Sequence, residues 1–248
     1  MTQSFANNSL ASHWRGFAGL RVVADVHGDA TAFEHAVAGA VAEDMFVLQL
    51  GDLTDHGPDS PAVLRLMFAL MDEGRGLFLL GNHDHKLRRA LMGQRVHVAP
   101  EGLGRTLEQL DVAPDGAVLK ARAIEEIANA PAWIRDGGRL FVHGGFHPGM
   151  LHSPPPPDAG AGKAHGLLTR ALYGQVTGRI RSDGYPDRVH DWVDRIPQDM
   201  VVVCGHDRRS TDGRPFIVDG RGGGRCVFLD CGAGKGGHLA WLDLPAWA

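Results

Sequence analysis

Apolar residues follow two alternating patterns along the first third of the chain. Short continuous apolar runs predict strands, whereas apolar residues three or four positions apart, such as Phe33, Val37 and Val41, predict helices. Strands are expected at 20–26, 45–50 and 76–80, and helices at 30–42, 61–71 and 85–92. Strand and helix therefore alternate, which predicts a parallel sheet with crossover helices.

The pattern changes in the remaining two thirds of the chain. A weaker helical signal covers 106–129, and later apolar strands are expected at 139–142, 200–204, 216–218, 225–229 and 238–242. Several of these are joined only by turns, as in an antiparallel region, and the proline-rich stretch 153–162 predicts an exposed irregular loop. With no repeat or linker in view, we expect a lead-in at 1–19, anchored through Trp14 and Phe17, and a single domain at 20–248.

Composition excludes several classes of protein. The 248 residues are 44% apolar and 22% charged, as in ordinary globular proteins, and the net charge of −4 gives no overall attraction to nucleic acid or anionic membranes. No apolar run approaches the roughly 20 residues of a transmembrane helix, and the polar N-terminus lacks a secretory pattern. Cys204, Cys226 and Cys231 form no CxxC pair, so we expect packing roles in a reducing cytoplasm.

Histidine is abundant, with 14 residues against two tyrosines, and its placement carries the chemistry. Polar clusters follow five expected strands: Asp25 and His27; Asp52 and Asp55; Asn82 and His83; His143; and His206. The carboxyl ends of parallel strands lie along one sheet edge, where open α/β sheets bind ligands. A single cluster of this kind is usually a turn. Five at successive strand ends predict a site.

The side chains in these clusters offer carboxylate, amide and imidazole ligands without a thiolate pair. That set suits Mn, Fe, Zn or Mg better than a structural zinc or an iron–sulfur centre. It is large enough for two ions about 3.5–4 Å apart, which can clamp a phosphate and activate water, while a nearby histidine protonates the leaving alcohol.

A glycine-rich stretch at 232–237 fits G-x-G-x-x-G, but the helix that follows a dinucleotide-binding loop has no room there. It also fails as a P-loop, because Gly236 follows Lys235 where Ser or Thr is needed. We expect a turn between two late strands, and no fused kinase.

The strand-end clusters resemble the calcineurin-like metallophosphoesterases, whose signature is D-x-H, G-D-x-x-D-R-G, G-N-H-[DE], H-G-G and a later G-H. The match runs from about residue 20 to the end of the chain. Within this superfamily, the chain resembles the phosphoprotein-phosphatase-like branch. The stretches 81–93, 105–110, 172–178 and 228–245 resemble the phosphatase module of bacterial polynucleotide kinase-phosphatases in particular. The resemblance implies an α/β fold, a four-layer αββα sandwich with two mixed β-sheets flanked by helices.

The resemblance also implies a binuclear centre, with manganese first and Fe, Zn, Ni or Mg as alternatives. It assigns the metal ligands as Asp25, His27 and Asp52 for one ion, and as the bridging Asp52, Asn82, His143 and His206 for the other. It makes His83 the general acid, oriented by Asp55, and places Asn82 and Asp230 near the substrate.

One residue departs from this family signature. His56 stands where the family has an arginine that grips phosphate. Arginine offers a fixed fork and a permanent charge, whereas histidine offers fewer donors and a pH-dependent charge. We therefore expect weaker phosphate binding, or a preference for phosphodiesters or acidic pH, with His56 still facing the substrate.

The expected activity is hydrolysis of phosphomonoesters by attack of a metal-bridging water. Polynucleotide 3′-phosphate or 2′,3′-cyclic phosphate ends fit a basic group made of Lys86, Arg88, Arg89, Arg95, Arg208 and Arg209, although a solvated helix face explains it equally well. A serine/threonine protein phosphatase and a dinucleoside-tetraphosphate hydrolase are the alternatives. Only His56 favours a further class, a non-catalytic metal- or phosphate-binding member. No membrane or obligate protein partner is indicated.

Overall fold

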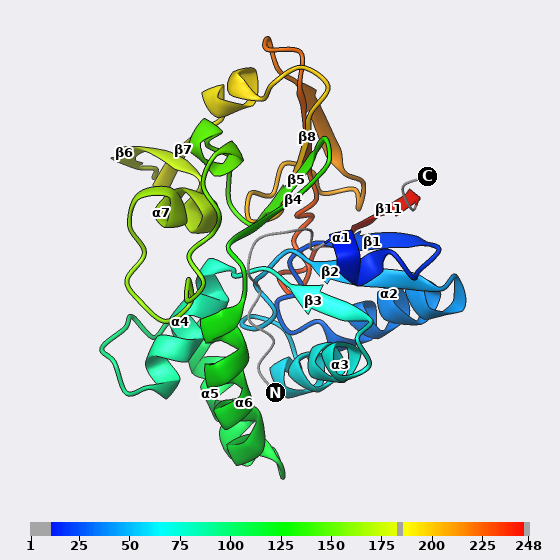
Figure 1. The fold of residues 1–248 in the computed structure, drawn as a ribbon. Helices are drawn as coiled ribbons and strands as arrows, with labels where there is room; N and C mark the ends of the chain where they lie inside the picture. The colour runs from blue at the N-terminus through cyan, green and yellow to red at the C-terminus, as the bar shows by residue number, and fades with distance from the viewer. Residues whose placement is uncertain (1–10, 183–185, 246–248) are drawn as a thin grey trace.

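The computed structural model describes residues 11–182 and 186–245, and it contains two mixed β-sheets packed face to face (Figure 1). The first sheet has the order β11-β1-β2-β3, with the bounds Trp241–Pro245, Gly19–Val23, Met45–Gln49 and Gly76–Phe78. Strands β1, β2 and β3 are parallel, as their long helical crossovers require, and β11 is antiparallel to β1.

The second sheet has the order β4-β5-β8-β10-β9. The bounds of these strands are Trp133–Asp136, Arg139–Val142, Val201–Cys204, Arg225–Phe228 and Phe216–Asp219. Strands β5, β8 and β10 are parallel and the two outer strands are antiparallel. A separate hairpin pairs β6 (Gln175–Ile180) with β7 (Pro186–Val189). The expectation of two mixed sheets is confirmed.

The core between the sheets is formed by alternate strand residues. Val22 and Leu48 of the first sheet are buried in one cluster with Phe141 and Val203 of the second. Trp14, on the short helix α1 (Ala11–Trp14), adds its ring to this cluster and lies edge-on to Phe141 at 6.4 Å between centroids. Residues 1–10 of the expected lead-in lie outside the described part of the chain.

Helices cover the outer faces and complete the four layers (Figure 1). The first sheet is covered by α2 and α3, with α4, α5 and α6 beside them; their bounds are Ala30–Ala42, Ser60–Asp72, Asn82–Leu91, Arg105–Val112 and Gly116–Asn129. Asp29 and Asp59 cap α2 and α3 by accepting backbone N–H groups. The second sheet is covered by shorter pieces: η2 (Pro148–Leu151), α7 (Gly166–Tyr173) and η3 (Asp191–Arg195), whose Trp192 packs on Phe228.

Several sequence expectations need correction. The helix expected at 85–92 begins at Asn82, because the Asp84 carboxylate accepts the Gly81 N–H and closes the first turn early. The last strand is not at 238–242 but at 241–245, since His238 forms only isolated bridges, to Cys231 and Gly232. The signal at 106–129 divides into α5 and α6, preceded by the irregular turn η1 (Pro100–Gly104).

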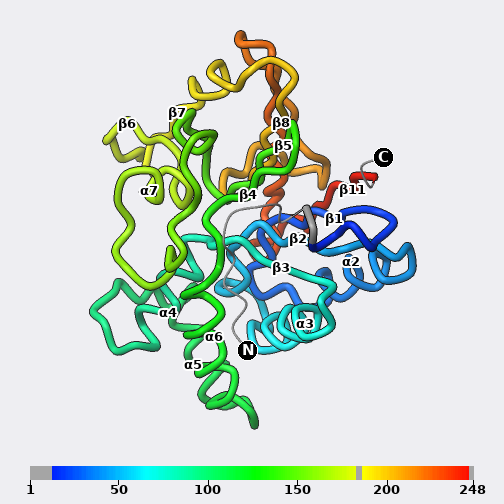
Figure 2. Tube along the Cα trace, viewed as in Figure 1, coloured from blue at the N-terminus to red at the C-terminus, as the bar shows by residue number. Residues whose placement is uncertain are grey.

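In the Cα trace of Figure 2, the proline-rich segment belongs to the yellow-green loop between η2 and α7, which runs down towards α4. That segment is irregular as expected, but its end is not exposed: Ala159 is buried, and Arg88 donates to the carbonyl of Gly160. In the part of the chain that the structure describes, the helices are too short or too polar to cross a bilayer.

Candidate metal centre

The loops after β1, β2, β3, β5 and β8 meet at one edge of the sandwich. Beyond the strands the backbone continues to pair, because His27 donates its N–H to the carbonyl of Asp52 at 3.0 Å. Gly205 does the same to the carbonyl of His143 at 3.0 Å. The sequence-distant clusters are therefore held together by backbone contacts as well as by topology.

Two of the histidines at this edge are oriented by backbone carbonyls. His27 Nδ1 lies 2.9 Å from the carbonyl oxygen of Thr54, and His143 Nδ1 lies 2.9 Å from that of Leu50. Each carbonyl fixes its ring and leaves Nε2 pointing into the site, as in metal-ligating histidines with an outer hydrogen-bond partner.

Three groups of ligand-type side chains result: His27, His56 and His83 form one, and two further groups overlap at Asp52. Asp25, His27 and Asp52 form one group, and Asp52, His143 and His206 form the other, with the ligand atoms of each group within 4.8 Å of one another. Asn82 Oδ1 lies 3.0 Å from His143 Nε2, which brings the amide into the second group. Asp52 belongs to both groups and lies between them.

The carboxylates are held by backbone donors. Asp25 accepts the N–H of His206 with both oxygens, at 3.0 and 3.1 Å, and Asp52 Oδ1 accepts the N–H of His83 at 2.8 Å. Only glycine fits at position 205, because an added Cβ would lie 2.0 Å from Asp25 Oδ1. Asp84, itself buried, accepts the N–H groups of Asp52 and Leu53 and so fixes the loop that carries Asp52.

Backbone strain is concentrated at this edge. In residues 11–182 and 186–245, seven non-glycine residues have a positive φ, and five of them are site candidates: His27, Asp52, Asp55, His56 and His206. Left-handed conformations are costly for such residues and persist where the surrounding structure enforces them, which is typical of functional sites.

The buried carboxyl and imidazole groups of the site shift one another's pKa values. Burial and repulsion from Asp230 raise the pKa of Asp25 well above its usual value. Burial also opposes ionisation of Asp52, but the nearby imidazoles of His143 and His83 outweigh it and bring the pKa of Asp52 well below normal. For His143, burial is outweighed by the carboxylates of Asp52 and Asp25, which raise its pKa to about 9.

These residues fit a divalent cation. His206 Nε2 is shielded from solvent and has no hydrogen-bond partner among the described residues, so it offers a lone pair into the cluster. Buried carboxylates at close quarters repel one another unless a cation lies between them. Oxygen and imidazole donors without thiolates suit Mn, Fe, Zn, Ni or Mg.

A second element lies beside the ligands. His83, in the first turn of α4, has its Nδ1 2.5 Å from Asp55 Oδ2, and its Nε2 lies 4.0 Å from Asp52 Oδ2. Asp55 is fully buried, and its other oxygen accepts the hydroxyl of Thr106 at 2.8 Å. The pair is therefore a fixed imidazole–carboxylate unit that faces the candidate ligands.

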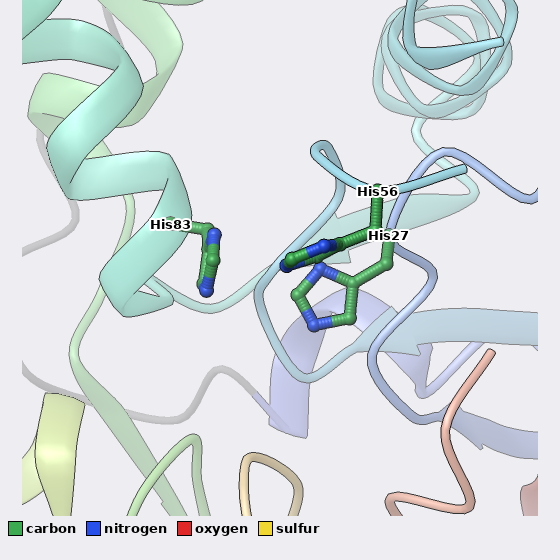
Figure 3. A group of neighbouring side chains, drawn as sticks. All are labelled: His27, His56 and His83. Carbon is green, nitrogen blue, oxygen red and sulfur yellow. The ribbon is translucent and has the colours of Figure 1, made fainter. Parts of the chain in front are cut away.

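His56 packs against this unit. Figure 3 shows the rings of His27, His56 and His83 facing one another, with His56 5.1 Å from His27 and 5.4 Å from His83 between centroids. Burial and the positive charge of Lys235 lower the pKa of His56 to about 4, so its ring carries no charge at neutral pH. Asp230 is buried next to the cluster, where it accepts the N–H of Gly232 at 2.8 Å.

The basic group noted in the sequence is partly committed to structure. Arg88 donates to the carbonyls of Ile124, Gly160 and Ala161, and Arg209 lies over the ring of Phe216. Each of these guanidinium groups holds loops or rings together. They offer little free charge to a polynucleotide.

Sequence reasoning missed three contributors. Thr106 and Asp84 position Asp55 and Asp52, but their partners are far away in the sequence, so no local pattern marks them. Lys235 reaches His27 Nε2 at 2.7 Å from the glycine-rich stretch that was interpreted as a plain turn. A cation in a glycine loop just after Asp230 was the available signal.

Comparisons with known proteins identify the family of this chain. The calcineurin-like phosphoesterase profile matches residues 20–216. The asymmetrical bis(5′-nucleosyl)-tetraphosphatase PrpE of Geobacillus thermodenitrificans is 32% identical over 199 residues, covering 79% of this chain and 74% of the relative. The protein of that name from Halalkalibacterium halodurans is 29% identical and covers 90% and 89%.

Solved structures show the same fold. A candidate diadenosine tetraphosphatase superposes with a TM-score of 0.55 at 21% identity, covering 93% of this chain and 95% of that one. A protein serine/threonine phosphatase from Saccharomyces cerevisiae gives 0.53 at 15% identity, covering 93% and 81%. The expected closeness to polynucleotide kinase-phosphatases is not shown by these matches and stays a prediction. With the family profile covering most of its length, the chain belongs to the calcineurin-like phosphoesterase family, whose members are metal-dependent hydrolases.

Proposed function

We propose that this chain hydrolyses dinucleoside tetraphosphates, and that Asp25, His27, Asp52, Asn82, His143 and His206 hold two divalent ions for the reaction. The observation that carries the reaction class is the shared Asp52, which lies in both ligand groups beside the His83–Asp55 unit. The substrate is supported by the relatives, which are named tetraphosphatases. We propose manganese as the metal, with Fe, Zn, Ni and Mg as alternatives.

The bound ions would stabilise charge on the phosphoryl oxygens and activate water as the nucleophile. The chain itself holds the ligand side chains in place: backbone N–H groups and carbonyls fix Asp25, His27 and His143 before any ligand binds. Ligands held in place in this way cost little reorganisation when charge develops in the transition state.

His83 would donate a proton to the oxygen of the leaving group. The Asp55 carboxylate, 2.5 Å from Nδ1, orients the ring so that Nε2 faces the candidate ligands, and the hydroxyl of Thr106 keeps that carboxylate in place. The proton on Nε2 is then the one available to the substrate side of the ring. Asp55 acts through His83 and is a positioning residue.

The candidate substrates differ in how basic their leaving groups are. Cleavage of a phosphoanhydride expels a phosphate, and because a phosphate group has a second pKa of about 6, it departs with little help from an acid. A sugar or serine alkoxide is far more basic and needs the proton. We therefore expect loss of the His83 imidazole to harm hydrolysis of alkyl phosphomonoesters more than that of tetraphosphates.

The other activities expected from the sequence remain as alternatives within the test. Polynucleotide 3′-phosphate and 2′,3′-cyclic ends are less favoured because Arg88 and Arg209 are engaged within the fold. Protein phosphatase activity shares the same core, and likeness to a solved protein phosphatase at 15% identity shows only the fold.

A substrate panel with the manganese-reconstituted protein tests the proposal. It compares diadenosine tetraphosphate, a 3′-phosphorylated oligonucleotide, a 2′,3′-cyclic nucleotide and a phosphopeptide, with Asp52→Asn as the inactive control. We expect the highest kcat/KM for the tetraphosphate. Its products should be a nucleoside triphosphate and a nucleoside monophosphate. A higher value for any other substrate would overturn the substrate assignment. Inactivity with every divalent metal would favour the non-catalytic alternative.

A further inference from the structure

The loop between β10 and β11 contains the glycine-rich stretch 232–237, which forms a hydrogen-bonded turn. Lys235 and Gly237 both donate their N–H groups to the carbonyl of Gly232, at 3.1 and 2.9 Å. The N–H of Gly232 is held by Asp230. Gly234 has a φ of 69°, and a Cβ there would lie 2.2 Å from the carbonyl oxygen of His27. The loop backbone is thus pressed directly against the metal-centre candidates.

The side chain of Lys235 extends from this turn into the site. Its Nζ lies 2.7 Å from His27 Nε2, which in turn is 3.7 Å from Asp52 Oδ2. In the described part of the chain no carboxylate lies within ion-pair distance of this ammonium, although the field of Asp230 reaches it. Lys235 therefore brings a positive charge that no described carboxylate pairs with to the place where the reaction would occur.

The position that carries the family's phosphate-gripping arginine offers no such charge. His56 presents an imidazole that packs against both His27 and His83, whose rings also contact each other (Figure 3). The guanidinium of Arg105 is close by, but it donates to the carbonyl of His56 at 2.7 Å and is tied to the backbone. A phosphate entering the site would meet the imidazole rings at positions 56 and 83 and the ammonium of Lys235.

We propose that Lys235 binds a phosphate oxygen of the substrate. The positive charge that contacts phosphate then lies on the loop between β10 and β11 and not at position 56. The inference rests on the proposed function of the same site. An ammonium and a metal ion cannot both lie at His27 Nε2, because like charges at that distance repel strongly. With its backbone anchored by Gly232, the flexible lysine stem would let the ammonium leave Nε2 and still stay beside the site.

The chemistry of lysine also indicates the class of substrate. Arginine forms a fixed two-pronged contact with one phosphate, whereas lysine is a mobile point charge with three donors. A point charge on a flexible stem suits a chain of several phosphates, whose negative charge is spread over many oxygens. Lys235 thus favours polyphosphate substrates over single phosphomonoesters.

The test measures binding of inorganic phosphate to the manganese-loaded protein by calorimetry, with metal content determined for each variant. We expect Lys235→Ala to weaken phosphate binding about tenfold or more, equivalent to about 1.4 kcal/mol. Lys235→Arg should retain most of the affinity. Introducing His56→Arg into Lys235→Ala should restore it, because a cation returns to the family position. Lys120→Ala, which removes a charge paired with Asp111, is the matched control.

Unchanged phosphate affinity in Lys235→Ala, with metal content intact, would overturn the inference. So would tighter metal binding without weaker phosphate binding, which would make Lys235 only a competitor for the metal site. If Lys235→Ala loses its metal, Lys235→Met keeps the apolar stem and the same comparison applies. Weaker phosphate binding in a protein that does not cleave diadenosine tetraphosphate would refute the proposed function while supporting the role of Lys235.

Discussion

Replacing Asp84 tests whether the loop that carries Asp52 is held from α4. Asp84 is buried, with 1% of its surface exposed, and it accepts three backbone N–H groups: from Asp52 at 2.7 Å, from Leu53 at 3.0 Å and from Gly81 at 3.0 Å. Asp84→Ala leaves all three donors without their acceptor. Because Asp52 adopts a positive φ of 61°, its loop has no intrinsic preference for the observed conformation.

The expected cost follows from these contacts. A buried donor left unsatisfied costs about 1–3 kcal/mol, so three give a loss of at least about 3 kcal/mol in the free energy of unfolding. For a chain of this size, that corresponds to a Tm lower by about 6–12 °C. Asp84→Asn keeps acceptors for two of the three groups but turns its amide donor toward the third, so we expect a loss of about 1–3 kcal/mol.

The free energy of unfolding is measured with denaturant, and manganese affinity is measured by titration of the same samples. The matched control is Asp59→Ala, which removes an exposed cap of α3 that accepts the N–H of Ala62 at 2.9 Å and should cost about 1 kcal/mol. Manganese affinity should fall in both Asp84 variants and stay unchanged in the control. If Asp84→Ala costs no more than Asp59→Ala, or if its manganese affinity equals that of wild type, Asp84 does not hold the Asp52 loop.

Three further changes are expected to have distinct signatures. Gly205→Ala should cut manganese affinity at least tenfold with little change in secondary structure, because its Cβ would lie 2.0 Å from Asp25 Oδ1; normal affinity in a titration would contradict the close approach. His83→Asn should lower kcat about 10²–10⁴-fold on an alkyl phosphomonoester and markedly less on diadenosine tetraphosphate, whereas equal losses would remove His83 as the proton donor. Chelation of the metal should lower Tm by several degrees, since bound ligand stabilises the folded state, and an unchanged scanning-calorimetry Tm would argue against an ion among the buried carboxylates.

Much of the first sheet could be predicted because local chemistry and tertiary packing agree there. The helix expected at 30–42 is α2 with the same bounds, since Asp29 caps its start and apolar residues recur on one face. The five strand-end clusters could be brought to one edge by topology alone, and contacts such as His143 Nε2 to Asn82 Oδ1 at 3.0 Å are in keeping with this.

Other features leave little trace in the sequence. The hairpin of β6 and β7 was missed because most residues of β6 are exposed, so no alternation of apolar and polar positions marks the strand. The early start of α4 was missed because its N-cap is Gly81, whose lack of a side chain gives no capping signal. Lys235 was missed because it acts across 208 positions in the sequence, through a turn whose own pattern is unremarkable.

The central claim is that Asp52 joins two ligand groups in one metal centre. Metal content measured by elemental analysis after manganese reconstitution, on wild type and Asp52→Asn, tests it most directly. We expect about two ions per wild-type chain, as in other two-metal sites, and clear loss of metal together with phosphoesterase activity in the variant. Full metal content and an undiminished rate in Asp52→Asn would contradict it.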